Sequence, residues 1–165
     1  FVYRKSSNYN IKDWNSEDLR KGIIGIVGES PPTIPLRDYD LMANARPYRL
    51  QRDLNLPPGH MIDDLVAGKI DVAIIWGPLG GYYAKKAKEP LVVVPLPAFK
   101  SERNSFDTQK GQAEFNISLA VRKKDKDRME MVQGALDRNQ SKILKILDDY
   151  GIPHVPVVLG DKTGK

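Results

Sequence analysis

The residues best suited to chemistry in this chain are aromatic. Trp76, Tyr82 and Tyr83 lie close together in the sequence, with the turn residues Gly77 and Pro78 between them. Trp and Tyr combine a large apolar ring with a polar edge, and both are enriched at the centres of contact surfaces. The cluster therefore predicts a surface that touches a ligand or a partner. The alternative is that Trp76 and one of the tyrosines simply pack the edge of the lobe.

Groups that could catalyse a reaction are not arranged to do so. His60 and His154 are the only histidines and lie far apart, with no spacing typical of a metal site. Asp63-Asp64 and Asp148-Asp149 are adjacent pairs on predicted helices, where sequence neighbours point to different faces. The chain has no cysteine, which excludes thiol nucleophiles and Cys-ligated metals. We predict a protein that is not an enzyme, with no catalytic residues, no metal site and no cofactor.

A second candidate contact site is the loop Glu29-Ser30-Pro31-Pro32-Thr33. A helix that follows such a loop can hold an anion through its free N–H groups. The two prolines remove two of those donors, and Glu29 adds a repelling charge. The interpretation as a rigid loop is therefore favoured over an anion site. Glu29, Ser30 and Thr33 remain candidates for contact, with Thr33 as a possible helix N-cap.

Both candidate sites follow predicted buried strands. Ile70–Ile75 is an apolar run broken only by Asp71, preceded by a helix that starts at Met61 and by Gly68, and Ile23–Val27 is similar. We predict that the two strands are central and parallel. Ligands of open α/β sheets bind at the carboxyl ends of the strands, which is where Trp76 falls. Arg4, at the end of a short first strand over residues 1–4, is expected near the same strand end.

The remaining elements complete an α/β pattern over residues 1–95. Helices are predicted over residues 14–20, 35–43 and 82–88, and strands over 48–50 and 91–94. Strands that alternate with helices indicate a parallel sheet with crossover helices. A polar connecting loop follows over residues 96–114.

The last part of the chain has a different pattern. Residues 115–121 alternate as a strand, and a helix is predicted over residues 126–150, ended by Gly151 and Pro153. Its apolar stripe consists of Val132, Leu136, Ile143, Ile146, Leu147 and Tyr150. We expect this stripe to stay off the core of the first ninety or so residues, and to be exposed or covered by another part.

Composition narrows the choice of partners. The net charge of the 165 residues is +5, but basic residues are mostly interleaved with acids, so nucleic-acid binding is not predicted. No apolar run approaches the roughly 18 residues that a membrane-spanning helix needs. The sequence opens on Phe1, which is neither an initiator Met nor part of a signal peptide. We therefore expect a mature product, a fragment or part of something longer.

Four stretches resemble, in the same order, segments of type 2 periplasmic solute-binding proteins. They are Val2–Lys5, Asp18–Ile26, Leu65–Ile75 and Asn116–Lys123. The resemblance implies a periplasmic protein of two lobes with ligand held between them. Residues 1–95 would be the complete second lobe, 96–114 a connecting loop, and 115–165 the closing strand, helix and tail of the first lobe. The main sheet of the first lobe would precede Phe1.

A narrower resemblance rests on the segment Trp-Gly-Pro-x-x-Gly-Tyr-Tyr-Ala over residues 76–84, and on Arg4–Tyr9 and Pro47–Leu50. These stretches are similar to the binding-protein homologues that accompany PQQ-dependent methanol dehydrogenases, the J accessory proteins. The resemblance implies an accessory or maturation factor that acts by protein contact with the dehydrogenase. The alternative is a solute receptor of an ABC transporter. Many amino-acid receptors carry an acid where Trp76 falls, so its indole argues against an ordinary amino-acid ligand and leaves open whether any small ligand binds.

Overall fold

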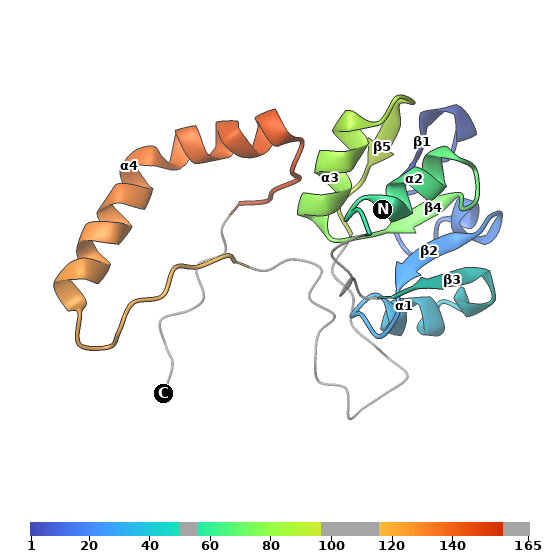
Figure 1. Cartoon of the computed structure of the whole chain (residues 1–165). Coiled ribbons are helices and arrows are strands. Elements are labelled where there is room, and N and C mark those ends of the chain that lie inside the picture. The colour runs from blue at the N-terminus through green and yellow to red at the C-terminus, as the bar shows by residue number, and fades with distance from the viewer. Residues whose placement is uncertain (50–55, 97–115, 157–165) are drawn as a thin grey trace.

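The structure is a computed structural model that describes residues 1–49, 56–96 and 116–156. Its strands are β1 (Val2–Arg4), β2 (Ile24–Val27), β3 (Ala45–Tyr48), β4 (Val72–Ile74) and β5 (Leu91–Val93). Its α-helices are α1 (Thr33–Asp38), α2 (His60–Val66), α3 (Gly77–Lys86) and α4 (Lys126–Tyr150), and 3-10 turns cover Lys5–Ser7, Glu17–Arg20 and Met42–Asn44. The first ninety-six residues form a lobe around one sheet, and α4 projects away from it (Figure 1).

The sheet has the strand order β3-β2-β4-β1-β5. β2 pairs in parallel with β4, with Ile24 opposite Val72 and Ile26 opposite Ile74, so the prediction of two central parallel strands is confirmed. On its other side β2 pairs in parallel with β3, where Ile26 lies opposite Pro47. The prediction of a fully parallel sheet is wrong at β1, which runs antiparallel to both β4 and β5. Only a parallel neighbour requires a crossover connection, and the sequence of β1 does not by itself show its direction.

Helices and loops cover both faces of the sheet with apolar side chains. On one face, Ile24, Ile26 and Ile74 pack with Leu36 of α1 and with Trp14 in a single buried cluster. On the other face, a second buried cluster joins the sheet to α2, and partly buried residues of α3 pack against this cluster. The buried members of the second cluster are Val2, Met61, Ile62, Leu65, Ile70 and Ala73. Successive strand residues serve opposite faces, as the alternation of a pleated strand requires. The lobe therefore has its own two-sided core.

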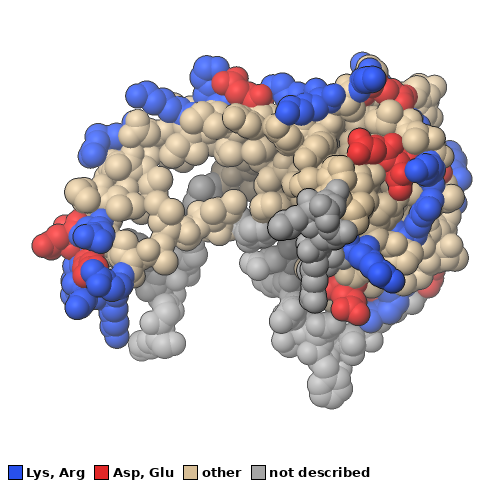
Figure 2. Space-filling view, in the orientation of Figure 1, with Lys and Arg blue, Asp and Glu red and all other residues tan. Residues whose placement is uncertain are grey.

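Helix α4 is apart from this core. Its bounds match the prediction, because Gly151 adopts a left-handed φ of 73° and ends the helix there. None of its residues is buried, and Ile146 of its apolar stripe is 55% exposed. Figure 2 shows Lys and Arg side chains along the upper side of α4, while its lower side is mostly uncharged. The expectation that α4 does not join the core of the lobe is confirmed.

Several predicted elements differ from those observed. Residues 116–121 form no strand, and Ile117 and Leu119 are 79% and 67% exposed, while Phe115 lies outside the described residues. Alternation makes a strand only where a neighbouring strand completes its hydrogen bonds. The predicted helix over residues 14–20 is a 3-10 turn at Glu17–Arg20.

Three further boundaries shift. α1 begins two residues before the predicted Pro35 and ends at Asp38, and Asp40 close behind it has a left-handed φ of 55°. The edge strand β3 begins at Ala45 instead of Tyr48, and Leu50 lies outside the described residues. α3 begins at Gly77 instead of Tyr82, because Pro78 falls in its first turn, where the fixed φ of proline suits a helix.

Candidate functional site

The strand connections place a topological switch point at the carboxyl edge of the sheet, and the surface at this point is called the crevice. From β2 the chain passes through α1 to β3 on one side, whereas from β4 it passes through α3 to β5 on the other. Ligands of open α/β sheets bind where neighbouring parallel strands send their connections in opposite directions. That point lies between the carboxyl ends of β2 and β4. Two of the predicted contact segments flank it, the loop that starts at Glu29 and Trp76, which lies two residues after the end of β4.

Trp76 is the exposed member of the predicted aromatic cluster. Its surface is 53% accessible, so Trp76 is not a core residue. It occupies the N-cap position of α3, where its carbonyl accepts a hydrogen bond from the Gly80 N–H at 2.9 Å. The indole ring thus stands at the crevice on a helix start that the backbone fixes. Such a ring can stack on, or be covered by, an incoming apolar or aromatic group.

The two tyrosines of the cluster are engaged inside the protein. Tyr83 is half-buried, packs against the second core cluster, and fits against Gly59, where a Cβ would lie 2.3 Å from its ring. Tyr82 lies edge-on to Tyr83 at 5.2 Å between ring centroids and stacks on Tyr150 of α4 at 5.9 Å. The ammonium of Lys86 lies 4.3 Å from the Tyr82 ring centroid. Their observed contacts are therefore with the lobe and with α4.

Gly77 and Pro78, the remaining members of the cluster, are half-buried in the first turn of α3. A Cβ at Gly77 would lie 3.1 Å from the ring of Pro153, which follows α4. The backbone of Gly77 is thus close to the end of α4. The motif over residues 76–84 combines one exposed ring with a helix face fitted to another segment of the same chain.

The loop after β2 is shaped by its own hydrogen bonds. Glu29 is exposed and adopts a left-handed φ of 58°, and the Ser30 hydroxyl donates to the Val27 carbonyl. Thr33 is the first residue of α1 and Pro32 holds the cap position, so the N-cap prediction for Thr33 is wrong. The Thr33 hydroxyl oxygen is buried, and within the described residues it has no hydrogen-bond partner. The hydroxyl of Ser30 thus closes the loop onto the end of β2, and the interpretation as a rigid loop stays a prediction.

Arg4 lies at the other end of the sheet. Because β1 runs antiparallel to β4, Arg4 sits beside the residues that enter β4, and the expectation that it lies near Trp76 is wrong. Its guanidinium donates to the carbonyls of Leu65 and Ile70, the latter at 2.8 Å, and to the Asp71 carboxylate at 2.8 Å. Asp71 in turn accepts from the Ile23 N–H at 2.9 Å. These contacts tie β1 to the loop before β4.

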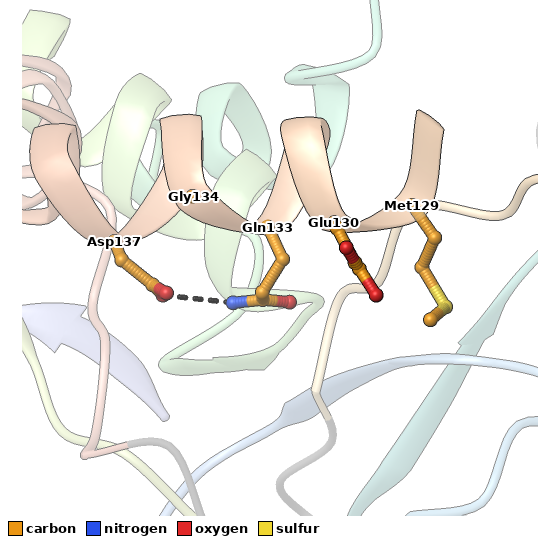
Figure 3. A pocket seen from close by; sticks show the side chains of 5 residues that line it. All are labelled: Met129, Glu130, Gln133, Gly134 and Asp137. Atoms are coloured by element: carbon orange, nitrogen blue, oxygen red, sulfur yellow. Dashed lines mark hydrogen bonds between the residues drawn. The ribbon is translucent and has the colours of Figure 1, made fainter. Parts of the chain in front are cut away.

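Sequence reasoning did not single out a hollow on α4 (Figure 3). Its lining residues are Met129, Glu130, Gln133, Gly134 and Asp137, its volume is about 360 Å³, and the Gln133 amide donates to Asp137 at 2.8 Å. All five residues come from this one helix. In the sequence, the residue that could have indicated this hollow is Gly134, because a glycine leaves a gap between longer side chains. Because a single helix lines it, the hollow belongs to the uncovered side of α4 and is separate from the crevice.

Two features bear on cofactors and membranes. Among the residues that the structure describes, no group of three or more His, Asp or Glu side chains could hold a metal ion. None of the described helices has the length and apolarity needed to cross a membrane.

Comparison with known proteins shows to which class of fold the chain belongs. No protein-family model matches the chain. It is 27% identical over 169 residues to Protein MoxJ of Methylorubrum extorquens, and the match takes in 95% of this chain and 55% of MoxJ. The chain therefore spans about half the length of that relative. The fold is that of a periplasmic binding protein, of which the chain holds a part.

Two solved structures narrow the likeness. The crystal structure of MxaJ from Methlophaga aminisulfidivorans MPT matches with a TM-score of 0.75 and 27% identity, over 93% of this chain and 65% of that one. Periplasmic binding protein XoxJ from Methylobacterium extorquens AM1 matches with a TM-score of 0.76 and 27% identity, over 94% and 67%. Within the class, the chain resembles the MxaJ/XoxJ type of binding protein, which confirms the narrower resemblance found in its sequence.

Proposed function

We propose that the chain is part of a periplasmic accessory or maturation factor of a PQQ-dependent methanol dehydrogenase, acting by protein contact and not as an enzyme. The observation that carries this proposal is the likeness to MoxJ, MxaJ and XoxJ over more than nine tenths of the chain. The crevice adds support, because the aromatic ring of Trp76 is exposed there. A large ring of this kind is a common anchor at the centre of a protein interface.

We also propose a division of the chain into lobes. Residues 1–95 would be the second lobe, 96–114 a connection, and 115–165 the closing strand, helix and tail of the first lobe. The separate core of the lobe and the uncovered stripe of α4 support this division. So does the exposure of Ile117 and Leu119, which alternate as a strand without forming one. A preceding part of the first lobe would complete both.

The test measures binding of the chain to a purified PQQ-dependent methanol dehydrogenase by surface plasmon resonance. Replacing Trp76 with Ala should weaken binding by about 30-fold, since an interface anchor contributes about 2 kcal/mol. The matched control is Ile23→Ala, because Ile23 is similarly exposed but precedes β2, at the opposite edge of the sheet. Equal affinities for the two variants would reject the crevice as the contact site, and absence of binding by the unsubstituted chain would reject the proposed function.

The second candidate function is that of a solute receptor for a transporter. It is favoured by the position of the crevice at the point where α/β proteins hold small ligands. Isothermal calorimetry against amino acids tests it. Tight amino-acid binding without dehydrogenase binding would promote the receptor over the accessory factor.

A further inference from the structure

The end of α4 meets α3 by direct contact of two backbones. A Cβ at Gly81 would lie 1.9 Å from the carbonyl oxygen of Gly151, and a Cβ at Gly151 would lie 3.0 Å from the carbonyl oxygen of Gly81. Gly151 also needs its left-handed φ of 73°. Glycine is the residue that permits both the conformation and the approach. We call this contact, with Lys85 and Tyr82 of α3 and Tyr150 of α4, the α3–α4 joint.

Polar contacts hold the joint in register. The ammonium of Lys85 donates to the carbonyl oxygens of Asp148 at 3.1 Å and Asp149 at 2.7 Å. Both residues belong to the last turn of α4, whose carbonyls carry the negative end of the helix dipole. The stacking of Tyr82 on Tyr150 adds an apolar contact on the same side. Lys85 therefore acts on α4 as a C-terminal cap supplied by a neighbouring helix.

The rest of α4 is not held in this way. No residue of the helix is buried, and Figure 1 shows it leaving the lobe at the end that meets α3. A helix of 25 residues is thus fixed at one end by a small set of contacts. The other end of α3 begins directly after Trp76, so one helix of ten residues touches both the crevice and α4.

We propose that the α3–α4 joint is a rigid coupling that fixes the direction of α4 relative to the sheet. α3 then links the crevice at Trp76 to the orientation of α4. The inference rests on contacts in this chain and does not depend on the proposed function. If residues 115–165 belong to the first lobe, the joint sets the angle between the two lobes, and this last consequence does rest on the proposed division.

Distance measurements between two spin labels test the coupling in the whole 165-residue chain. The chain contains no cysteine, so Lys12→Cys and Arg128→Cys provide the only labelling sites, one in the lobe and one near the start of α4. Arg128 lies about 33 Å along the helix from the joint, at 1.5 Å per residue, so a small rotation at the joint gives a large displacement there. Electron paramagnetic resonance should give a single narrow distance peak.

Gly81→Val should broaden or shift this peak, since its side chain would meet Gly151 and Pro153 and push α4 away. Gly134→Ala is the matched control, because a Cβ there meets only the flexible end of Arg138, and its peak should stay unchanged. A peak that is unchanged in Gly81→Val, or one that is already broad in the unsubstituted chain, would overturn the proposal.

A second variant avoids any effect on folding. Lys85 is exposed, so Lys85→Gln removes the ammonium that caps α4 without disturbing the core, and it should broaden the peak to a smaller extent. Unfolding followed by tryptophan fluorescence checks that the lobe is intact, because Trp14 is buried within it. A peak that remains narrow in Lys85→Gln and in Gly81→Val, with the lobe folded, would show that other contacts direct α4.

Discussion

The lobe of residues 1–49 and 56–96 and the helix α4 both carry apolar side chains but use them differently. In the lobe, short strands and helices of three to ten residues bury their apolar side chains on both faces of one sheet. In α4, an uninterrupted helix of 25 residues buries none. An apolar stripe is buried only where a second surface packs against it, and such packing supplies most of the stability of a helix in a protein. The same substitution should therefore lower the free energy of unfolding strongly in the lobe and weakly in α4.

A matched pair of isoleucines tests packing directly. Ile62 of α2 is 2% exposed and Ile146 of α4 is 55% exposed. Ile62→Ala should reduce the free energy of unfolding by about 3 kcal/mol, because it removes buried methyl groups and leaves a cavity. Ile146→Ala should change it by about 0.5 kcal/mol or less. Chemical denaturation followed by tryptophan fluorescence distinguishes them, and similar losses for both would show that α4 has a packed face.

A matched pair of aspartates gives the smallest contrast. Asp71 binds the Arg4 guanidinium and the Ile23 N–H in the lobe, whereas Asp149 pairs with Lys145 at 3.0 Å on the exposed side of α4. Asp71→Ala should cost about 2 kcal/mol, since it leaves partly buried donors without their acceptor. Asp149→Ala should cost about 0.3 kcal/mol, as surface pairs on a helix do. If Asp71→Ala were as mild as Asp149→Ala, the Arg4 contacts would not hold the sheet together.

How much could be predicted from sequence also differs between the two regions. The bounds of α4 were correct because its stop signals, Gly151 and Pro153, are local. In the lobe, β2 and β4 were found from their apolar runs, but the direction of β1 depends on a partner that is far away in sequence, and so the position of Arg4 was wrong. The pair Gly77-Pro78 predicts a loop turn but lies in the first turn of α3. Proline is common at both positions, so the sequence does not distinguish them.

The candidate site was predicted in part. Trp76 was placed at the carboxyl edge, since strand ends follow from apolar runs. The contacts of Tyr82 with α4 could not be anticipated, because they join residues whose nearness depends on the whole fold. The spacing of Gly77 and Gly81 was the available signal, since glycines four apart share one helix face. This spacing indicates that another segment packs closely against that helix face, but it does not identify the segment. The contact roles of Glu29, Ser30 and Thr33 stay predictions.

The outer strand β3 has a consequence for how these molecules meet each other. In β3 the carbonyl of Tyr48 accepts from the N–H of Gly28, the residue after β2, so residues 46 and 48 turn their backbone groups inward and Pro47 turns its groups outward. Pro47 therefore removes the N–H that a strand from another molecule would need at the middle of this edge. Edge-to-edge association, the first step of many aggregates, is disfavoured on this side of the sheet. The proline costs the sheet no internal hydrogen bond.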